Sequence, residues 1–297
     1  MSESSIIWGI NEKRGEQKLS LGPPPFIKGD GGGLFKIFSY NHLMKIALTI
    51  AGSDPTGGAG FQADLKVFSA LGVYGLSVPA CLTAQNTSGV KRVLPIPPDF
   101  VKEELETLLR DIKPDALKTG MLLSKETIRV IADSIRKHRL KNFVIDPVYI
   151  SSSGKKLIEP GGISILREYL LPLARVITPN LKEAEALTGI SISSLDEMAE
   201  AAWSIKELGP EVVIITGGHL KGDPADLYCD GKDFHLIKGK RIPGQYHGTG
   251  CAYSAAITAL LAKGEKPLEA ARGAKRFVEK AIRNSFQPGK GMGILGF

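Results

Sequence analysis

The chain alternates short apolar runs with amphipathic stretches from residue 45 onward. The first apolar run is "KIALTI", and a loop rich in glycine, proline and aspartate follows it, which is typical of a buried strand. The next stretch, "FQADLKVFSALG", places Phe61, Leu65 and Phe68 on one helical face, and Gly72 stands where that helix should end. The pattern therefore predicts a strand followed by a helix.

The same reasoning predicts the elements that follow. Further strands are expected at "LSVPACLTA", "PDALKTGML", "NFVIDPV", "ARVITPN" and "EVVIITGGH", with a weaker edge strand at "KRVLPI". Helices are expected at residues 98–112, 125–138, 181–189 and 194–209, then from about Thr249 and Pro267, and a hairpin around Asp230-Gly231. Repeated strand–helix units predict an α/β fold with a mostly parallel central sheet and helices on both faces. The ligand site of such a sheet lies outside the carboxyl ends of its strands.

Residues 1–43 lack this periodicity and combine three consecutive prolines with a glycine run in "KLSLGPPPFIKGDGGGLFK". Such a composition predicts a disordered or non-native extension. Met44 stands directly before the first strand and could be the true start. We therefore expect one folded domain over residues 44–297.

Composition narrows the possible partners. The net charge is +7, but the basic residues are scattered, and the densest short patch is Lys238, Lys240 and Arg241, so nucleic-acid binding is not expected. The three cysteines are widely spaced, which argues against disulfides or zinc and favours a cytoplasmic protein. We expect no membrane partner, because no apolar run reaches the length of a membrane span, and no signal peptide begins the chain.

The stretch "PGQYHGTGCAYSAA" carries the strongest chemical signal. Gly248, Thr249 and Gly250 precede an alanine-rich helix, and the free N–H groups of a helix start suit an anion. Cys251 follows at once, and at a helix N-terminus its pKa should fall, so that the thiolate could accept a proton. The alternatives are an ordinary glycine-rich turn and an inert buried cysteine.

A second signal is "TPNLKEAE", in which Asn180 and Glu183 stand three residues apart at a helix start. They could face Mg²⁺ and nucleotide phosphates, with Asp146 of "NFVIDP" as a second carboxylate near the metal. The alternatives are a local helix cap for Asn180 and Glu183 and a turn before proline for Asp146.

Taken in order, the motifs resemble the hydroxymethylpyrimidine/phosphomethylpyrimidine kinases of thiamine biosynthesis, in the ribokinase-like superfamily. They are "TIAGSDPTGGAGFQADLKVFSALGVYG", "LTAQNTSGV", "KTGML", "DPV", "ITPNLKEAEAL", "GGH" and "HGTGCAYSAAI", over about residues 44–286. The resemblance implies a ribokinase-like three-layer sandwich and two phosphorylations by ATP with Mg²⁺. The substrate would be 4-amino-5-hydroxymethyl-2-methylpyrimidine, converted to its monophosphate and then its diphosphate. It also suggests a homodimer, with the apolar edge near "KRVLPI" as one possible contact.

The resemblance also assigns roles to residues at matching positions. Gln85 matches the glutamine that reads the pyrimidine, and an amide suits an aminopyrimidine edge. Other pyrimidine contacts match Asp64, the backbone near Gly52, and Met121 as a pocket wall. Asn180 and Glu183 match the phosphate and metal motif, Gly248, Thr249 and Gly250 the anion hole, and Cys251 the catalytic position, where many kinases of the superfamily carry aspartate.

One departure concerns the nucleotide site. The family often has lysine before "GGH", where this chain has Thr216, so a charge that neutralises phosphate could come from elsewhere, such as Lys221. This leaves room for a pyridoxine or pyridoxal kinase of the same superfamily, although Gln85 and Cys251 favour the pyrimidine. A non-catalytic nucleotide-binding module would need neither a base at Cys251 nor a carboxylate at Glu183. A nicotinamide-dependent oxidoreductase is disfavoured, because no Gly-x-Gly-x-x-Gly motif follows the first strand.

Overall fold

The computed structural model describes residues 44–149, 157–218 and 224–297, so the predicted extension and Lys221 lie outside the described residues. The strands of the main sheet are β1 (Ile46–Gly52), β2 (Tyr74–Asn86), β3 (Gly89–Pro95), β4 (Ala116–Thr119), β5 (Phe143–Ile145), β6 (Val176–Ile177), β7 (Val212–Ile215), β8 (Ala225–Cys229) and β9 (Phe234–Lys238). The helices are α1 (Gly60–Ala70), α2 (Pro98–Asp111), α3 (Lys125–His138), α4 (Gly162–Ile165), α5 (Leu181–Thr188), α6 (Leu195–Lys206), α7 (Thr249–Ala262) and α8 (Pro267–Arg283). A small pair, β10 (Tyr246–His247) and β11 (Gly293–Ile294), completes the set.

Within the described residues, the sheet has nine strands in the order β3-β2-β1-β4-β5-β6-β7-β8-β9. Six central strands are parallel to one another: β2, β1, β4, β5, β6 and β7. The edge strand β3 runs antiparallel to β2, and the β8–β9 hairpin at the other edge is also antiparallel. The hairpin turns at Asp230 and Gly231, as predicted. The sequence motif "KRVLPI" forms the edge strand β3, where its proline is tolerated.

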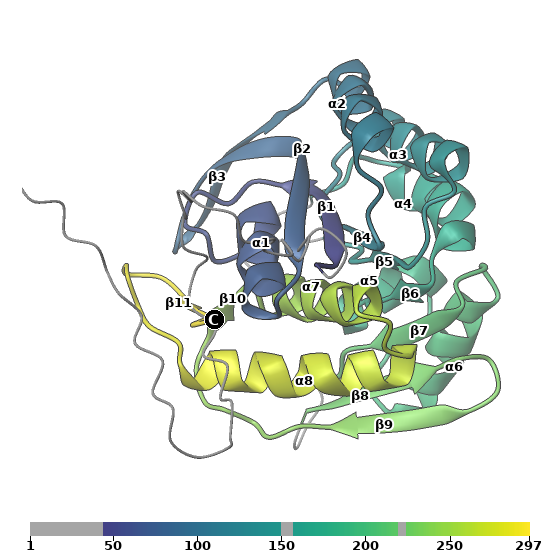
Figure 1. Ribbon diagram of the computed structural model, residues 1–297. Coiled ribbons are helices and arrows are strands. Elements are labelled where there is room, and N and C mark those ends of the chain that lie inside the picture. The colour runs from purple at the N-terminus through teal and green to yellow at the C-terminus, as the bar shows by residue number, and fades with distance from the viewer. Residues whose placement is uncertain (1–43, 150–156, 219–223) are drawn as a thin grey trace, which may run out of the picture. The chain divides into compact units, whose positions relative to one another are not determined.

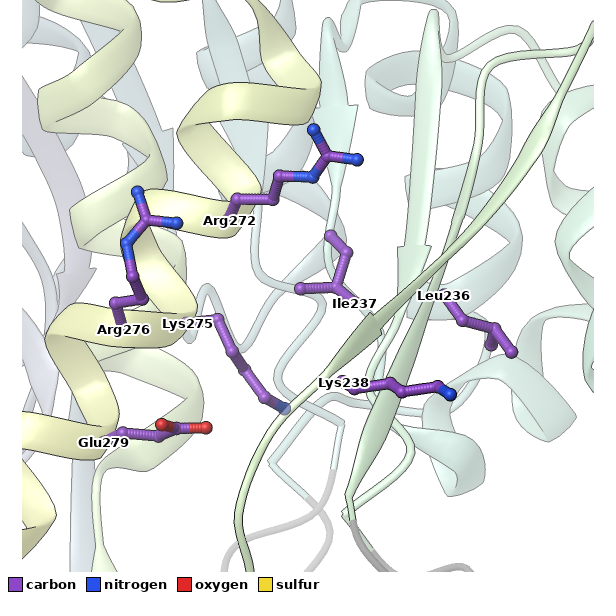
Figure 2. Close-up of a pocket in the computed structure, with 7 residues that line it drawn as sticks. All are labelled: Leu236, Ile237, Lys238, Arg272, Lys275, Arg276 and Glu279. Atoms are coloured by element: carbon purple, nitrogen blue, oxygen red, sulfur yellow. The ribbon is translucent and has the colours of Figure 1, made fainter.

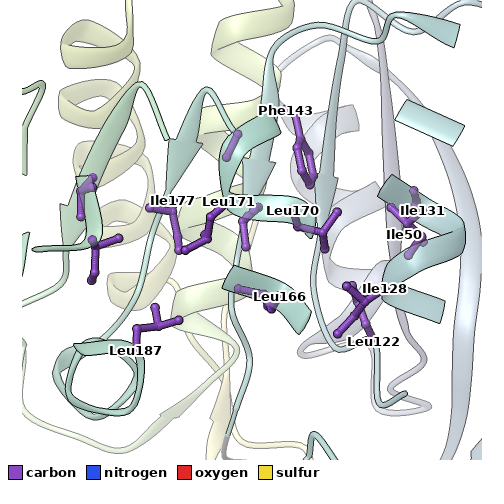
Figure 3. Packing of buried hydrophobic residues seen from close by; sticks show 14 of the residues in the cluster. Ile50, Leu122, Ile128, Ile131, Phe143, Leu166, Leu170, Leu171, Ile177 and Leu187 are labelled. Atoms are coloured by element: carbon purple, nitrogen blue, oxygen red, sulfur yellow. The ribbon is translucent and has the colours of Figure 1, made fainter. Parts of the chain in front are cut away.

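Helices cover both faces of the sheet, as the apolar runs predicted. Strand residues alternate between the two faces: Leu48 and Ile50 of β1 pack with α2, α3, α5 and α6, whereas Ala47 packs with α1, α7 and α8. Figure 1 shows α1, α7 and α8 together on one side, and Figure 3 shows Ile50 and Phe143 in the core of the other. The three-layer α/β sandwich is therefore confirmed.

The buried face of α1 differs from the prediction. Phe68 is fully buried, but Phe61 and Leu65 are only half-buried, and Ala63, Asp64 and Val67 fill the interface instead. The predicted apolar face placed aspartate on the exposed side of the helix. The side chain of Asp64 is instead buried, because it has the polar partners described below. The predicted end of the helix is confirmed, because Gly72 directly follows the last turn with a φ of +69°.

The elements of residues 162–173 and the β10–β11 pair were not predicted. Residues 162–173 form α4, a π-helical turn (Leu166–Leu170) and a 3-10 turn (Leu171–Leu173), which bury Leu166, Leu170 and Leu171. In addition, the C-terminal segment pairs with β10 through β11, and the backbone N–H of Met292 donates to the carbonyl of Thr87. The C-terminal tail thus lies next to the end of β2.

Candidate active site at the starts of helices α1 and α7

The predicted anion loop lies against the loop that precedes α1. Gly248 is the N-cap of α7 with a φ of +78°, and a Cβ atom there would lie 1.8 Å from the carbonyl oxygen of Gly58. Only glycine fits both the backbone conformation and this close approach. Gly60, the first residue of α1, donates a backbone hydrogen bond to the sulfur of Cys251. The starts of two helices, each with free N–H groups, therefore converge at one place, which favours an anion.

A buried polar network lies beneath these helix starts. Lys118 on β4 is fully buried, and its Nζ lies 2.8 Å from Asp64 Oδ1 and 3.9 Å from Asp146 Oδ2. Thr49, which pairs with Lys118 in the strand register, donates to Asp64 Oδ2 at 2.6 Å, and Ser254 of α7 donates to Asp146 Oδ2 at 3.0 Å. Burial opposes the charge of Lys118, but the two carboxylates outweigh it and raise the pKa of its ammonium. Asp64 is therefore enclosed by partners from this network, and its predicted contact with substrate stays a prediction.

The predicted fall in the pKa of Cys251 is wrong. Burial raises the pKa of its thiol to about 12, and the nearby charge of Asp146 adds to the rise. The ammonium of Lys118 and the N–H of Gly60 act in the opposite direction, but they do not outweigh burial. The raised pKa makes the residue at the helix start a protonated thiol at neutral pH, beside the carboxylate of Asp146.

The phosphate and metal motif has the geometry of a capping box. Asn180 Oδ1 accepts from the N–H of Glu183 at 3.0 Å, and Glu183 Oε2 accepts from the N–H of Asn180 at 2.9 Å. Burial, with the charge of Asp146, raises the pKa of Glu183 to about 8. Thr216 lies beside this helix start, because its N–H donates to the carbonyl of Pro179. The structure thus brings Asn180, Glu183 and Thr216 together, and the local capping alternative is also correct.

The fit of a divalent cation can be judged from these carboxylates. Within residues 44–149, 157–218 and 224–297, no group of three or more His, Cys, Asp or Glu side chains forms a complete metal site. However, among the described residues Asp64, Asp146 and Glu183 carry three carboxylates against the one ammonium of Lys118, and burial raises the pKa of both Asp146 and Glu183. Mg²⁺ usually takes one or two protein carboxylates together with water and phosphate oxygens. The acidic excess fits such an ion.

The predicted pyrimidine reader belongs to a hydrogen-bonded chain of three side chains. Gln85 Nε2 lies 2.9 Å from His247 Nε2, which lies 3.0 Å from Asp54 Oδ2. Asp54 also accepts from the N–H groups of Thr56 and Ala59 in the loop before α1. Burial opposes the charge on Asp54, but the hydrogen bonds from His247 and Thr56 outweigh it and lower the pKa of its carboxyl.

The other predicted pyrimidine contacts lie at the end of β1. A Cβ atom on Gly52 would lie 2.5 Å from Met121 Cε and 2.7 Å from Cys81 Sγ, so these residues are direct neighbours. Because Gly52 has no side chain, the Cε methyl group of Met121 and the sulfur of Cys81 can approach the backbone there. The structure therefore brings Gly52 and Met121 together, as predicted.

A separate basic pocket lies between β9 and α8 (Figure 2). It encloses about 300 Å³ and is lined by Leu236, Ile237, Lys238, Arg272, Lys275, Arg276 and Glu279, none of which was predicted as a site residue. Lys275 pairs with Asp226 and Arg272 with Glu269, so acidic partners offset part of the charge. We assign no role to this pocket.

Several residues of the site were not predicted, namely Thr49, Asp54, Lys118, His247 and Ser254. Lys118 carried a usable signal, because a charged residue inside the otherwise uncharged strand "ALKT" needs a buried partner. Asp54 and His247 stand within quoted motifs, but their contact joins residues 193 positions apart and no local pattern indicates it.

Within the described residues, no helix combines the length and the apolar character needed to cross a membrane.

Comparisons with known proteins bear on this geometry. Residues 54–296 match the phosphomethylpyrimidine kinase family. The hydroxymethylpyrimidine/phosphomethylpyrimidine kinase of Synechococcus elongatus is 46% identical over 256 residues, which cover 85% of this chain and 97% of that protein. The thiamine biosynthesis bifunctional protein ThiED of Geobacter sulfurreducens is 47% identical over 248 residues, which cover 83% of this chain and 51% of that protein. The chain thus spans about half the length of this bifunctional relative.

Solved structures show the same likeness. A phosphomethylpyrimidine kinase from Clostridium difficile has a TM-score of 0.72 and 43% identity, covering 80% of this chain and 99% of that one. The pyridoxal kinase of Staphylococcus aureus in complex with ADP has a TM-score of 0.80 and 40% identity, covering 85% and 93%. Both the predicted family and the ribokinase-like fold are confirmed. With its phosphate-favouring helix starts and its match over most of the described residues, the chain belongs to the phosphomethylpyrimidine kinase family.

Proposed function

We propose that this kinase uses ATP to phosphorylate 4-amino-5-hydroxymethyl-2-methylpyrimidine to the monophosphate and then to the diphosphate, in thiamine biosynthesis. The observation that carries the proposal is the position of Gln85 and Cys251 around the converging helix starts, because both match the family's pyrimidine-kinase motifs. The named relatives support the same reaction. Its site would work in the cytoplasm, where the free thiols of Cys81, Cys229 and Cys251 remain reduced.

The anion loop would hold the transferring phosphoryl group. The N–H groups of Thr249, Gly250 and Cys251 belong to the first turn of α7, which leaves them without carbonyl partners inside the helix. Gly248 lets this turn sit directly on the loop before α1, so both helix starts can act on one anion. Phosphoryl transfer depends mainly on positioning and on stabilising charge, which such oriented N–H groups provide.

Cys251 and Asp146 would together receive the proton of the attacking hydroxymethyl group. The thiol is protonated and lies beside Asp146, so it cannot simply act as a thiolate base. As the hydroxyl oxygen bonds to phosphorus, its proton would move to the sulfur while the thiol proton moves to the Asp146 carboxylate.

Mg²⁺ would be held near Glu183 and Asp146, on the side of the network with excess negative charge. When bound, it supplies positive charge that offsets the carboxylates and the phosphate oxygens. Asn180 would keep Glu183 in place through the capping box. Thr216 carries no charge, and Lys221, the suggested replacement for the family's lysine, lies outside the described residues.

Product analysis tests the proposed reaction. Purified protein with ATP and Mg²⁺ should convert the pyrimidine alcohol first to the monophosphate and then to the diphosphate. Mass spectrometry of the reaction mixture over time identifies both products. Pyridoxal is the matched comparison, because the neighbour from Staphylococcus aureus is a pyridoxal kinase. A higher kcat/KM for pyridoxal than for the pyrimidine would reverse the proposal in favour of that alternative.

A further inference from the structure

His247 Nε2 contacts one side chain that requires a hydrogen-bond donor and another that requires an acceptor. It lies 3.0 Å from Asp54 Oδ2 and 2.9 Å from the amide nitrogen of Gln85. Asp54 is a fixed acceptor, because its carboxylate also receives the N–H groups of Thr56 and Ala59. An ionised carboxylate can only accept, so Nε2 must carry the hydrogen that it donates to Asp54.

The other ring nitrogen supports this assignment. His247 Nδ1 is buried and has no hydrogen-bond partner within the described part of the chain. If Nδ1 carried the only ring proton, a buried donor would be left without an acceptor, and the lone pair of Nε2 would face the Asp54 carboxylate. Both arrangements are unfavourable, whereas a proton on Nε2 leaves only a lone pair at the unpartnered site.

The orientation of the Gln85 amide follows from this proton. The Nε2–H group of His247 and the NH₂ group of Gln85 are both donors, so they cannot bond to each other. A half-turn of the Gln85 amide exchanges its nitrogen and its oxygen, and the hydrogen-bond network decides between the two orientations. After that half-turn the carbonyl oxygen faces the Nε2–H group of His247 and shares its one hydrogen with Asp54 in a bifurcated hydrogen bond. The NH₂ group then lies where Oε1 stood, 3.4 Å from Thr83 Oγ1. Thr83 already donates its hydroxyl proton to the carbonyl of Ser53 at 2.9 Å, so its oxygen is free to accept.

We propose that Asp54 and His247 are positioning residues that hold the carbonyl of Gln85 inward, so that Gln85 offers the substrate only an N–H donor. The inference rests on the proposed function, in which Gln85 contacts the pyrimidine. It deepens that function, because a donor pairs with a ring nitrogen of the pyrimidine and not with its amino group. One amide hydrogen goes to Thr83, and the second is left for the ligand.

The first arm of the test identifies the group that Gln85 contacts. It compares kcat/KM of the pyrimidine with that of two pyridine analogues, each lacking one ring nitrogen, and with an analogue lacking the amino group. One pyridine analogue should lose about 5- to 150-fold in the wild type, and Gln85→Leu should remove most of that loss. The loss from deleting the amino group should be the same in both proteins. If Gln85→Leu instead removes the amino-group loss, the amide is oriented the other way and the proposal is wrong.

The second arm asks whether His247 sets that orientation. The analogue is the 4-oxo pyrimidine, whose ring nitrogen beside the oxo group carries a proton and is therefore a donor. The wild type should discriminate against it, and His247→Leu should reduce the ratio of kcat/KM values by about tenfold, because Gln85 can then turn and accept. His247→Gln, which keeps an N–H donor, should preserve the ratio.

The ratio separates positioning from general damage. Both substrates are measured on one preparation, so misfolded protein or a slower chemical step lowers both values equally. An unchanged ratio in His247→Leu, with the ring-nitrogen effect of Gln85 intact, would overturn the role of His247 alone. If no ratio responds to Gln85→Leu, the proposed contact of Gln85 with the pyrimidine fails, and this inference fails with it.

Discussion

At Cys251 two electrostatic effects oppose each other. A helix start stabilises a nearby negative charge by about 0.3–1 kcal/mol, and by up to about 2 kcal/mol when partly buried, which lowers a pKa by little more than one unit. Burial beside Asp146 moves the thiol further in the other direction, to a pKa of about 12. The sequence indicated the helix start but not that Asp146 would lie beside the thiol, because Asp146 lies 105 positions earlier at another strand end. Glu183 is subject to the same excess of buried negative charge.

Glu183→Gln should make the protein more stable at pH 8 and less active. The pKa of Glu183 is about 8 in the folded protein, against 4.5 for an ordinary glutamate. Between these values the folded state binds more protons than the unfolded state, so the contribution of Glu183 to stability falls as the pH rises from 4.5 to 8. The neutral variant lacks this dependence.

Thermal unfolding measured at pH 5 and pH 8 checks this expectation. The variant should gain a few degrees in Tm over the wild type at pH 8 and much less at pH 5. Asn180 can still donate to the remaining amide oxygen, so the capping box is largely kept. A lower Tm for the variant at pH 8 would show that the charge of Glu183 is favourable in the folded protein.

The two helices α1 and α7 make the site through their starts. Their contact depends on glycines that are visible in the sequence, but the partner of each glycine is not. Gly248 needs its positive φ and has the carbonyl of Gly58 directly beside it, whereas Gly250 has open space around its Cα and an ordinary φ. The sequence motif treats the two glycines alike, and the structure separates them.

Gly248→Ala should therefore disrupt the start of α7, whereas Gly250→Ala should not. The added Cβ at residue 248 would meet backbone atoms at 1.8 Å, and backbone cannot move aside as a flexible side chain can. We expect Gly248→Ala to lower the free energy of unfolding by about 1–3 kcal/mol or more. Urea denaturation followed by circular dichroism compares the variants, and equal midpoints would show that the loops can separate freely.

At the scale of the whole molecule, periodicity and turn signals predicted the parallel sheet, the edge strand and the hairpin around Asp230-Gly231. Strand order and the buried polar network could not be predicted, because Thr49, Lys118 and Asp146 meet through the register of three different strands. The turns at residues 166–173 were missed because a π-helical turn and a proline interrupt the helical period. The pairing of Asn180 with Glu183 could be predicted from the sequence, because a capping box joins residues only three positions apart.

We also propose that two copies of the chain associate through the β2–β3 edge. Leu82 and Leu94 lie opposite each other in the strand register, yet they are 42% and 51% exposed. Phe100 is 54% exposed at the following helix. Sedimentation velocity should give a dimer for the wild type and a monomer for Leu94→Glu, because the added charge would be buried without a partner. A wild-type monomer at micromolar concentration would contradict this contact.

The most direct test of the whole account is the single-turnover rate of Cys251→Ala with ATP and the pyrimidine, measured by rapid chemical quench. If the thiol and Asp146 receive the substrate's proton, the rate should fall by about 10²–10⁴-fold while both substrates still bind. Asp146→Asn should cause a loss of similar size. A near-wild-type rate for Cys251→Ala, with chemistry limiting, would show that the thiol at the start of α7 is only packed there and that another group takes the proton.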